Sequence, residues 1–458
     1  MQTKRLLGPH KNVAFELFKK VENLPLLCPH GHVDPSLLST EDLRFPDPVA
    51  LFLRPDHYLL RMLYSQGHSL EFFLDETIDP RTVWRVFCEN FKLFWGTPSA
   101  LWLDYQLRET FGIQEPISGE SADTIFELLE SKLAQSEFAP RSLFERFNIE
   151  ILATTDAATD TLEHHRAIRE SDWGGRVIPT FRPDKLLWTK SELWSSELMR
   201  LEELESMSIT GLSAFLEALR SRRTFFAELG CVATDHGCET PYTEVLSPEL
   251  AENLFQKALK AQISHDEAVR LQGHLLIEMA AMSSEDGLVM QLHPGSSRNH
   301  NSQLFGRFGP DKGADIPRAV NFTEALKPLL NRFGSHSNFR FLVFTLDESN
   351  YSRELAPLAG HYPAMLLGPP WWFHDSLNGM LRYFDQVMET AGVFNTAGFN
   401  DDTRAFCSIP ARHDLWRRAS CRWLSGLVAE GILNMEQAHV LAEELAVGRA
   451  RAAYKLTS

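Results

Sequence analysis

The sequence predicts an α/β protein built on a parallel (β/α)8 barrel of the TIM type, with a helical insertion after the first strand. Eight short apolar or β-rich runs are spread along the 458 residues, and helical patterns follow most of them. Strands separated by helices pair in parallel, and eight such strands imply a closed barrel. Ionisable residues follow most of these runs, and barrel enzymes gather their active-site residues at the carboxyl ends of the strands.

The candidate strands are recognised by short β-rich composition bounded by polar or turn residues. They are LPLLC at 24, IEILATT at 149, RVIPTF at 176, LGCVAT at 229, LVMQLH at 288, FRFLVFTL at 339, AMLLG at 364 and VFNTAGFN at 393.

The gap between the first two runs is far longer than one crossover helix requires. Within it, DPVALFLRPDHYLLRMLYSQ, RTVWRVFCENFKLFWG and SADTIFELLESKLAQ place apolar residues at helical spacing. We therefore expect residues 36–145 to form a helical insertion over the active-site end, and residues 1–35 and 146–458 to form the barrel. Closing helices are expected after the last run, with breaks at Gly426 and Gly431.

Charge and composition limit the class of protein. A formal net charge of -16 excludes a surface for nucleic acid or an anionic membrane, because both require a basic face. An anionic ligand would need local arginines instead. The six cysteines have no C-x-x-C spacing, which favours reduced, buried thiols. The start of the chain lacks a long apolar segment and no run is long enough to span a membrane, so a soluble cytoplasmic enzyme is expected.

The first strand ends in His-Gly-His. His30 and His32 lie at i and i+2 of an extended chain and so point to the same face, where they could bind one metal ion. Alternatively, they close the strand and form local hydrogen bonds. Asp402, at the end of the eighth strand, would complete a three-ligand site with positions open for water or substrate, which is typical of a catalytic metal.

The other strand ends carry residues that could be functional or structural. Arg182 is a candidate for anion binding or for a structural salt bridge. Asp156 is expected to cap the helix that follows it, and His164 and His165 to lie on a solvated helix face. Trp371 and Trp372 are expected in core or loop packing, although one of them could wall a sugar pocket.

Nine stretches in order identify a resemblance along nearly the whole chain. They are PHGHVDP, DHYLLRM, TTDAATDTLEHHRAI, PTFRPDK, GCVATDHG, VMQLHPGSSRNHN, LFGRFGPDKGAD, GPPWWFHDSLNGML and DDTRAFCSIPARHDLWRR. The sequence resembles the uronate isomerases of the amidohydrolase superfamily, whose fold is a distorted (β/α)8 barrel with a helical insertion after the first strand.

The resemblance implies roles for individual residues. It makes His30, His32 and Asp402 the ligands of one divalent ion, with zinc expected. It makes Asp402, Tyr58 and Arg404 catalytic. The residues that it places around the sugar acid are Arg182, Asp235, His293, Arg298, Trp371 and Trp372.

The implied reaction interconverts D-glucuronate with D-fructuronate, and D-galacturonate with D-tagaturonate, by proton transfer between C2 and C1. Such a reaction needs a base, a stabiliser for the enediolate oxygen and an acid. Asp402 would be the base, Arg404 or the metal would offset the negative charge, and Tyr58 would assist proton movement. Arg182 and Arg298 are the candidates for binding the substrate carboxylate.

Three departures from the family pattern accompany this hypothesis, at Asp34, in the loop LDESNYSREL after the sixth expected strand and at His374, and two alternatives stand beside it. Asp34 stands near the expected metal site as a helix cap or a partner for a histidine, and His374 replaces a common Asn at the expected pocket rim. The alternative functions are a mononuclear metal-dependent hydrolase on the same barrel and a sugar-acid binding protein. A homo-oligomer is expected only because large barrel enzymes often associate.

Overall fold

The main strands of this protein pair in parallel, as their alternation with helices predicts. In the computed structural model, which describes residues 4–456, β1 (Leu26–Cys28) pairs with β2 (Ile149–Ala153), which pairs with β4 (Val177–Ile178). A second sheet has the order β11-β10-β7-β6-β5-β3. Its strands are β3 (Asp156–Ala157), β5 (Phe181–Arg182), β6 (Ala233–Cys238), β7 (Val289–Pro294), β10 (Phe341–Val343) and β11 (Met365–Leu367). The protein is therefore a mixed α/β molecule with parallel sheets.

The two sheets meet near the ends of the second and third expected strands. β2 lies within the second expected strand and β3 directly follows it, whereas β4 lies within the third and β5 begins at its last residue. Backbone hydrogen bonds continue across the division, because Thr154 N donates to Ile178 O and Asp156 N donates to Thr180 O, both at 3.0 Å. A separate antiparallel pair, β8 (Ser296–Ser297) with β9 (Ile316–Pro317), lies in the loop after β7.

The eighth expected strand is wrong over most of its length. Val393–Asn395 form a 3-10 turn, and Thr396 makes one isolated parallel bridge to Leu367. Gly398 then adopts a φ of +73°, which takes the backbone out of the extended conformation, and a Cβ there would lie 2.5 Å from Ala450 N. The end of the first strand reaches this segment through one hydrogen bond, from His32 N to Thr403 O at 3.0 Å.

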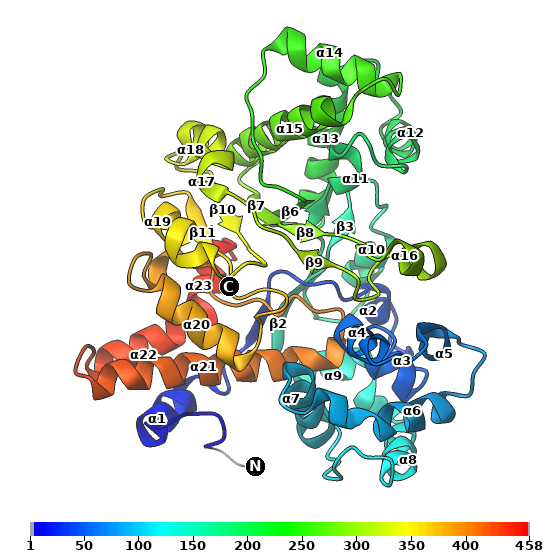
Figure 1. Ribbon diagram of the computed structural model, residues 1–458, viewed down its shortest axis with the longest axis vertical. Coiled ribbons are helices and arrows are strands. Elements are labelled where there is room, and N and C mark those ends of the chain that lie inside the picture. The colour runs from blue at the N-terminus through cyan, green and yellow to red at the C-terminus, as the bar shows by residue number, and fades with distance from the viewer. Residues whose placement is uncertain (1–3, 457–458) are drawn as a thin grey trace.

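The segment expected to be helical is helical. It contains α2 (Ser36–Ser39), α3 (Pro48–Phe52), α4 (His57–Ser65), α5 (Leu70–Leu74), α6 (Pro80–Glu89), α7 (Pro98–Tyr105), α8 (Ala122–Leu133) and α9 (Pro140–Arg146). These helices gather on one side of the molecule (Figure 1). Their apolar cluster joins Trp84 and Phe126 of the helices to Leu152 of β2, so this segment and the sheet share one core. The division into two domains stays a prediction.

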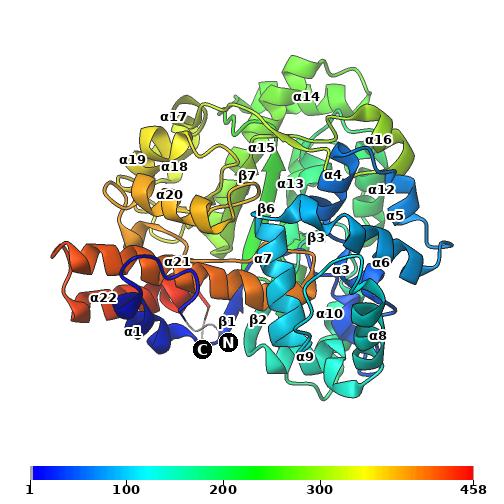
Figure 2. The same cartoon turned by 60° about the horizontal axis from the view of Figure 1, so that its bottom comes forward.

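The remaining helices surround the sheets, and the last long helix lies across the side where β1 begins. Figure 2 shows β1 beside α21 (Ile409–Ala429), with α1 (Lys11–Val21) and α22 (Met435–Glu443) against the same helix. Gly426 lies inside α21, so the expected break there is wrong, whereas Gly431 follows the helix end with a φ of +74°. The others are α10 (Glu163–Glu170), α11 (Asp184–Leu187), α12 (Trp194–Glu205), α13 (Leu212–Glu228), α14 (Pro248–Leu259), α15 (His265–Asp286), α16 (Ser302–Phe308), α17 (Phe322–Ala325), α18 (Lys327–Phe333), α19 (Ala356–Ala359), α20 (Leu377–Val387) and α23 (Arg449–Ala453).

Within residues 4–456, no helix is both long enough and apolar enough to cross a membrane.

Candidate active site

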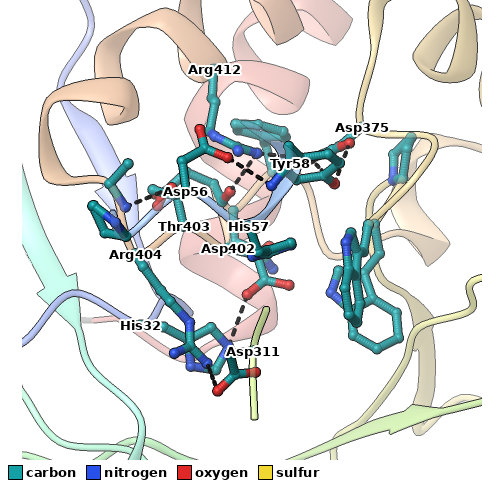
Figure 3. A pocket seen from close by; sticks show the side chains of 18 of the residues that line it. His32, Asp56, His57, Tyr58, Asp311, Asp375, Asp402, Thr403, Arg404 and Arg412 are labelled. Carbon is teal, nitrogen blue, oxygen red and sulfur yellow. Dashed lines mark hydrogen bonds and ion pairs between the residues drawn. The ribbon is translucent and has the colours of Figure 1, made fainter. Parts of the chain in front are cut away.

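A pocket lies where the ends of β1 and β11, the segment 399–405 and helix α4 meet (Figure 3). It contains most of the residues predicted to act on a ligand. The predicted residues that line it are His32, Tyr58, Arg298, Trp371, Trp372, Asp402 and Arg404. Arg182, His293 and Arg298 line a second cavity, so Arg298 is shared by the two.

His30, His32 and Asp402 come together as the sequence predicts. Nε2 of His30 lies 3.4 Å, and Nε2 of His32 3.1 Å, from the same carboxylate oxygen of Asp402. Burial alone would raise the pKa of Asp402, but the two imidazoles outweigh it and hold that pKa well below its usual range. Asp402 has a φ of +40°, a left-handed conformation that Asp tolerates better than most residues.

His293 is a further imidazole at the same place. Its ring stacks on His30 with 4.6 Å between ring centroids, and ligand atoms of His30, His293 and Asp402 lie within 4.8 Å of one another. Nδ1 of His293 lies 2.6 Å from Oδ1 of Asp235, whereas its buried Nε2 has no hydrogen-bond partner within residues 4–456. Burial lowers the pKa of His293 to about 4, so this imidazole is neutral at pH 7 and its free nitrogen can accept.

The donor set fits a divalent transition metal. Neutral imidazoles and an ionised carboxylate are the ligands that zinc prefers. In the part of the chain that the structure describes, two buried ring nitrogens, Nδ1 of His30 and Nε2 of His293, have no hydrogen-bond partner. His293, whose other nitrogen faces a carboxylate, has the arrangement common among metal-binding histidines. The geometry therefore supports a metal site, and His293 is a candidate ligand of it, although the sequence predicted only a contact between His293 and the substrate.

Arg182 is held by two carboxylates. Its Nε donates to Oδ2 of Asp184 at 2.6 Å, and Nη1 lies 3.3 Å from Oδ2 of Asp235. Burial would raise the pKa of Asp235, but Arg182 and His293 together keep it well below its usual range. The structural salt bridge is therefore present, and Asp235 links Arg182 to His293.

Tyr58 is fixed by three groups. Its hydroxyl donates to the Asp375 carboxylate, 3.0 and 3.1 Å from the two oxygens, and accepts from Phe373 N at 3.1 Å. Nη1 of Arg412 donates to the same carboxylate at 2.8 Å. Burial, and then the charge of Asp375, raise the pKa of Tyr58 well above its usual range, so this phenol stays protonated at pH 7.

Two arginines lie at the edge of the pocket. Nη2 of Arg404 is 3.0 Å from Oδ2 of Asp311, and Nη1 of Arg298 is 3.2 Å from Oδ2 of Asp315 and 3.9 Å from Asp311. Both arginine side chains are 41% exposed. They can therefore reach a ligand, unlike Arg182, whose guanidinium is engaged on both sides.

The two tryptophans differ in their surroundings. Trp371 is 7% exposed and packs edge-on against His293, with 4.7 Å between ring centroids. Trp372 is half-buried, and the guanidinium of Arg298 lies 5.7 Å from its ring centroid. Both tryptophans line the pocket, so they pack against neighbouring side chains and also form part of the pocket wall.

Asp311, Asp375 and Arg412 were not predicted to act at the site, although all three line the pocket. The sequence signal that could have found them is their position inside three of the nine matching stretches, since none has a spacing that marks it alone.

Three other expectations are corrected. Asp156 does not cap α10, because it lies in β3 and accepts from Thr154 Oγ1 at 2.7 Å. His165 is buried and lies 2.8 Å from the same hydroxyl, so it is not on a solvated face, and His164 is half-buried. His374 is 2% exposed and its Nε2 lies 3.0 Å from the Tyr351 hydroxyl, so it does not stand at the rim.

Asp34 acts as a local turn acceptor. Its Oδ1 accepts from Ser36 N at 2.9 Å in a turn just before α2, whose N-cap position is Pro35, so Asp34 does not cap that helix.

Comparisons with known proteins agree in family and fold. The family model described as "Glucuronate isomerase" matches residues 2–452. A uronate isomerase of Nostoc punctiforme is 51% identical, covering 97% of this chain and 96% of the relative. The crystal structure of a glucuronate isomerase from Caulobacter crescentus has a TM-score of 0.98 at 46% identity, covering 100% of this chain and 97% of that one. A uronate isomerase structure from Thermotoga maritima has a TM-score of 0.93 at 28% identity, covering 97% of each chain.

Proposed function

This chain belongs to the glucuronate isomerase family, and on that premise we propose how its residues isomerise a sugar acid. The chain is an aldose-ketose isomerase that acts on uronates. Relatives that are about half identical to it over 97% of its length are named uronate isomerase. The hydrolase alternative is not favoured. D-glucuronate and D-galacturonate are the substrates that we propose, with D-fructuronate and D-tagaturonate as their products.

Asp402 is the proposed base for the C2 proton. Its carboxylate is ionised at pH 7, because His30 and His32 hold its pKa low, and it lies in the wall of the pocket. Only one of its oxygens faces the two imidazoles, so the other can face a sugar carbon. A carboxylate at this position can take the proton from C2 and return it to C1 on the same face.

Tyr58, Asp375 and Arg412 are the proposed proton relay for the sugar oxygens. The phenol of Tyr58 has one proton, which it donates to Asp375 here and can turn toward a sugar oxygen, while Arg412 holds Asp375 in position. This connection allows a proton to pass between O1 and O2 while Asp402 acts on carbon.

Arg298 and Arg404 are the proposed partners of the substrate carboxylate and of the charge that develops during enolisation. Each is partly exposed, and each now faces an aspartate that a bound carboxylate can replace as partner. Trp372, against Arg298, would form the adjoining wall. Arg182 is better placed to orient His293 through Asp235 than to bind substrate.

His30, His32 and Asp402 are the proposed ligands of one divalent ion, with zinc the choice that fits imidazole and carboxylate. When bound, such an ion polarises oxygen and stabilises negative charge. His293 lies against His30 and faces the same space with a free nitrogen, where it can contact a sugar hydroxyl.

We also propose a distorted (β/α)8 barrel, completed by the segment that follows β11. The parallel order of the strands and the bond from His32 to Thr403 support it. All six cysteines are free and five are buried, which supports a reducing, cytoplasmic location.

Isomerisation in deuterated water tests the proposed base. With D-glucuronate or D-galacturonate, wild-type protein is expected to give ketose labelled at C1 or aldose exchanged at C2. Asp402→Asn should lower turnover by about 10²- to 10⁴-fold, the contribution of a positioned base. Asn tolerates the left-handed backbone, so far-ultraviolet circular dichroism should match wild type. Near-normal turnover in that variant would overturn the assignment of the base.

A further inference from the structure

Next to the proposed active site lies a second cluster of residues that can bind metal. Cys28 ends β1, Asp401 precedes Asp402 and His413 lies in α21. One ligand atom from each lies within 4.8 Å of the others, and all three residues are buried. The two adjacent aspartates thus serve two clusters, Asp402 with His30 and His32, and Asp401 with Cys28 and His413.

The distances fit tetrahedral coordination. Sγ of Cys28 is 3.7 Å from Nε2 of His413, and that nitrogen is 3.4 Å from Oδ2 of Asp401. With zinc bonds of about 2.3 Å to sulfur and about 2.0–2.2 Å to nitrogen or oxygen, tetrahedral ligands lie about 3.3–3.7 Å apart. The two observed separations fall in that range.

The Asp401 carboxylate has no other partner that would explain its burial. Its side chain is 0% exposed, and among residues 4–456 neither oxygen accepts a hydrogen bond from a group outside this cluster. The nearby Arg417 does not supply one, because its guanidinium donates to the backbone oxygens of Glu22, Leu24 and Pro25. An isolated buried carboxylate is costly, so this arrangement calls for a cation.

We propose that Cys28, Asp401 and His413 bind a second, structural zinc ion, separate from the ion at the active site. A thiolate, a carboxylate and a neutral imidazole balance the charge of one divalent cation, so the buried site is neutral overall. The three side chains supply three of the four ligands of a tetrahedral site, and a water molecule would supply the fourth. The ion would tie β1, the segment 399–405 and α21 together where the described strands form no continuous ladder.

Metal content tests the site. Protein loaded with zinc and then desalted is analysed by mass spectrometry. Cys28→Ser is expected to hold about one equivalent of zinc less than wild type. Cys421→Ser is the matched control, because Cys421 is also buried and lies on α21 outside the cluster. A Cys28→Ser protein with wild-type zinc content would overturn the proposal.

Cobalt substitution gives a second measurement that does not depend on a variant. Wild-type protein loaded with Co²⁺ should show a thiolate-to-cobalt charge-transfer band in the near ultraviolet, because the active-site set contains no sulfur. The band should persist in His32→Ala, so failure of the proposed active-site ligands would leave it unchanged. Absence of the band from cobalt-loaded wild-type protein would overturn the proposal even if Cys28→Ser does not fold.

Discussion

Three imidazoles are candidate ligands of the proposed active-site metal, and mutation of His32 and of His293 separates the roles of these two. His30 and His32 face Asp402 directly, whereas His293 has one nitrogen facing Asp235 and the other free. We expect His32→Ala to lower zinc affinity at the active site at least tenfold, and His293→Ala to retain the ion while losing activity. Metal titration of both variants checks this, with the exposed His361→Ala as control.

The opposite pattern, zinc retained in His32→Ala and lost in His293→Ala, would make His293 the third ligand in place of His32.

Asp156 is expected to make stability fall with rising pH. Burial raises its pKa from 3.8 to about 7 in the folded protein. Between those two pKa values only the folded state holds the proton, so unfolding releases it. The free energy of unfolding therefore declines as pH rises, and the full loss is reached above about pH 7. One pKa unit corresponds to about 1.4 kcal/mol, so we expect Asp156→Asn to be more stable than wild type by at least about 1 kcal/mol at pH 8.

Thermal unfolding at pH 5 and pH 8 measures this effect. The advantage of Asp156→Asn should be smaller at pH 5. An advantage that is equal at both pH values would show that Asp156 does not titrate in this range.

For single residues, sequence spacing predicted which side chains lie together when they are close in the chain. It did not predict contacts between residues that are far apart in the chain. The i, i+2 spacing placed His30 and His32 on one side of Asp402. Nothing local marks Asp375, because its partner Tyr58 lies 317 residues away. The prediction for Asp156 was wrong because an Asp that precedes a helix usually caps that helix. Here Asp156 lies in the sheet and accepts a hydrogen bond from the Thr154 hydroxyl.

Among the elements, α4 carries the proposed relay residue in its first turn. Asp56 caps this helix, accepting from Tyr58 N at 2.9 Å and Leu59 N at 3.2 Å. Asp56→Ala removes both bonds and should cost about 1 kcal/mol of unfolding free energy, with a several-fold loss of turnover as Tyr58 loses its anchor. Asp56→Asn keeps the cap and is the matched control.

Denaturant unfolding and steady-state rates measure the two effects. If Asp56→Ala were as stable as Asp56→Asn, the cap would not be what fixes Tyr58.

Elements were predictable where composition and periodicity agree. The amphipathic helices of residues 36–145 and the apolar strands β7, β10 and β11 fall where expected. The eighth strand does not, because Gly398 turns the backbone and packs against α23, and neither effect is visible in the run VFNTAGFN itself.

For the whole molecule, the acidic net charge is compatible with an anionic substrate because the charge is arranged locally. Arg298 and Arg404 stand at the pocket edge, and Asp311 lies between them. The acidic composition predicted that an anionic ligand would need local arginines. Only the fold shows that Arg298 and Arg404 lie close together.

Removing the proposed divalent ions should loosen the junction between the two ends of the fold. The end of β1 and the segment 399–405 are joined by the bond from His32 to Thr403 and by the proposed ligands. Free ion at a thousand times its Kd stabilises a site by about 4 kcal/mol. At about 2.1 cal/mol/K of unfolding entropy per residue, a chain of this length should lose roughly 4 °C in Tm for each site emptied.

Calorimetry with and without a chelator measures that shift, together with activity. Zinc should restore both Tm and turnover, whereas calcium, which prefers oxygen ligands, should restore neither. If Tm were unchanged after complete metal removal, the protein alone would hold β1 against the segment 399–405. The ions would then contribute to chemistry without stabilising the fold.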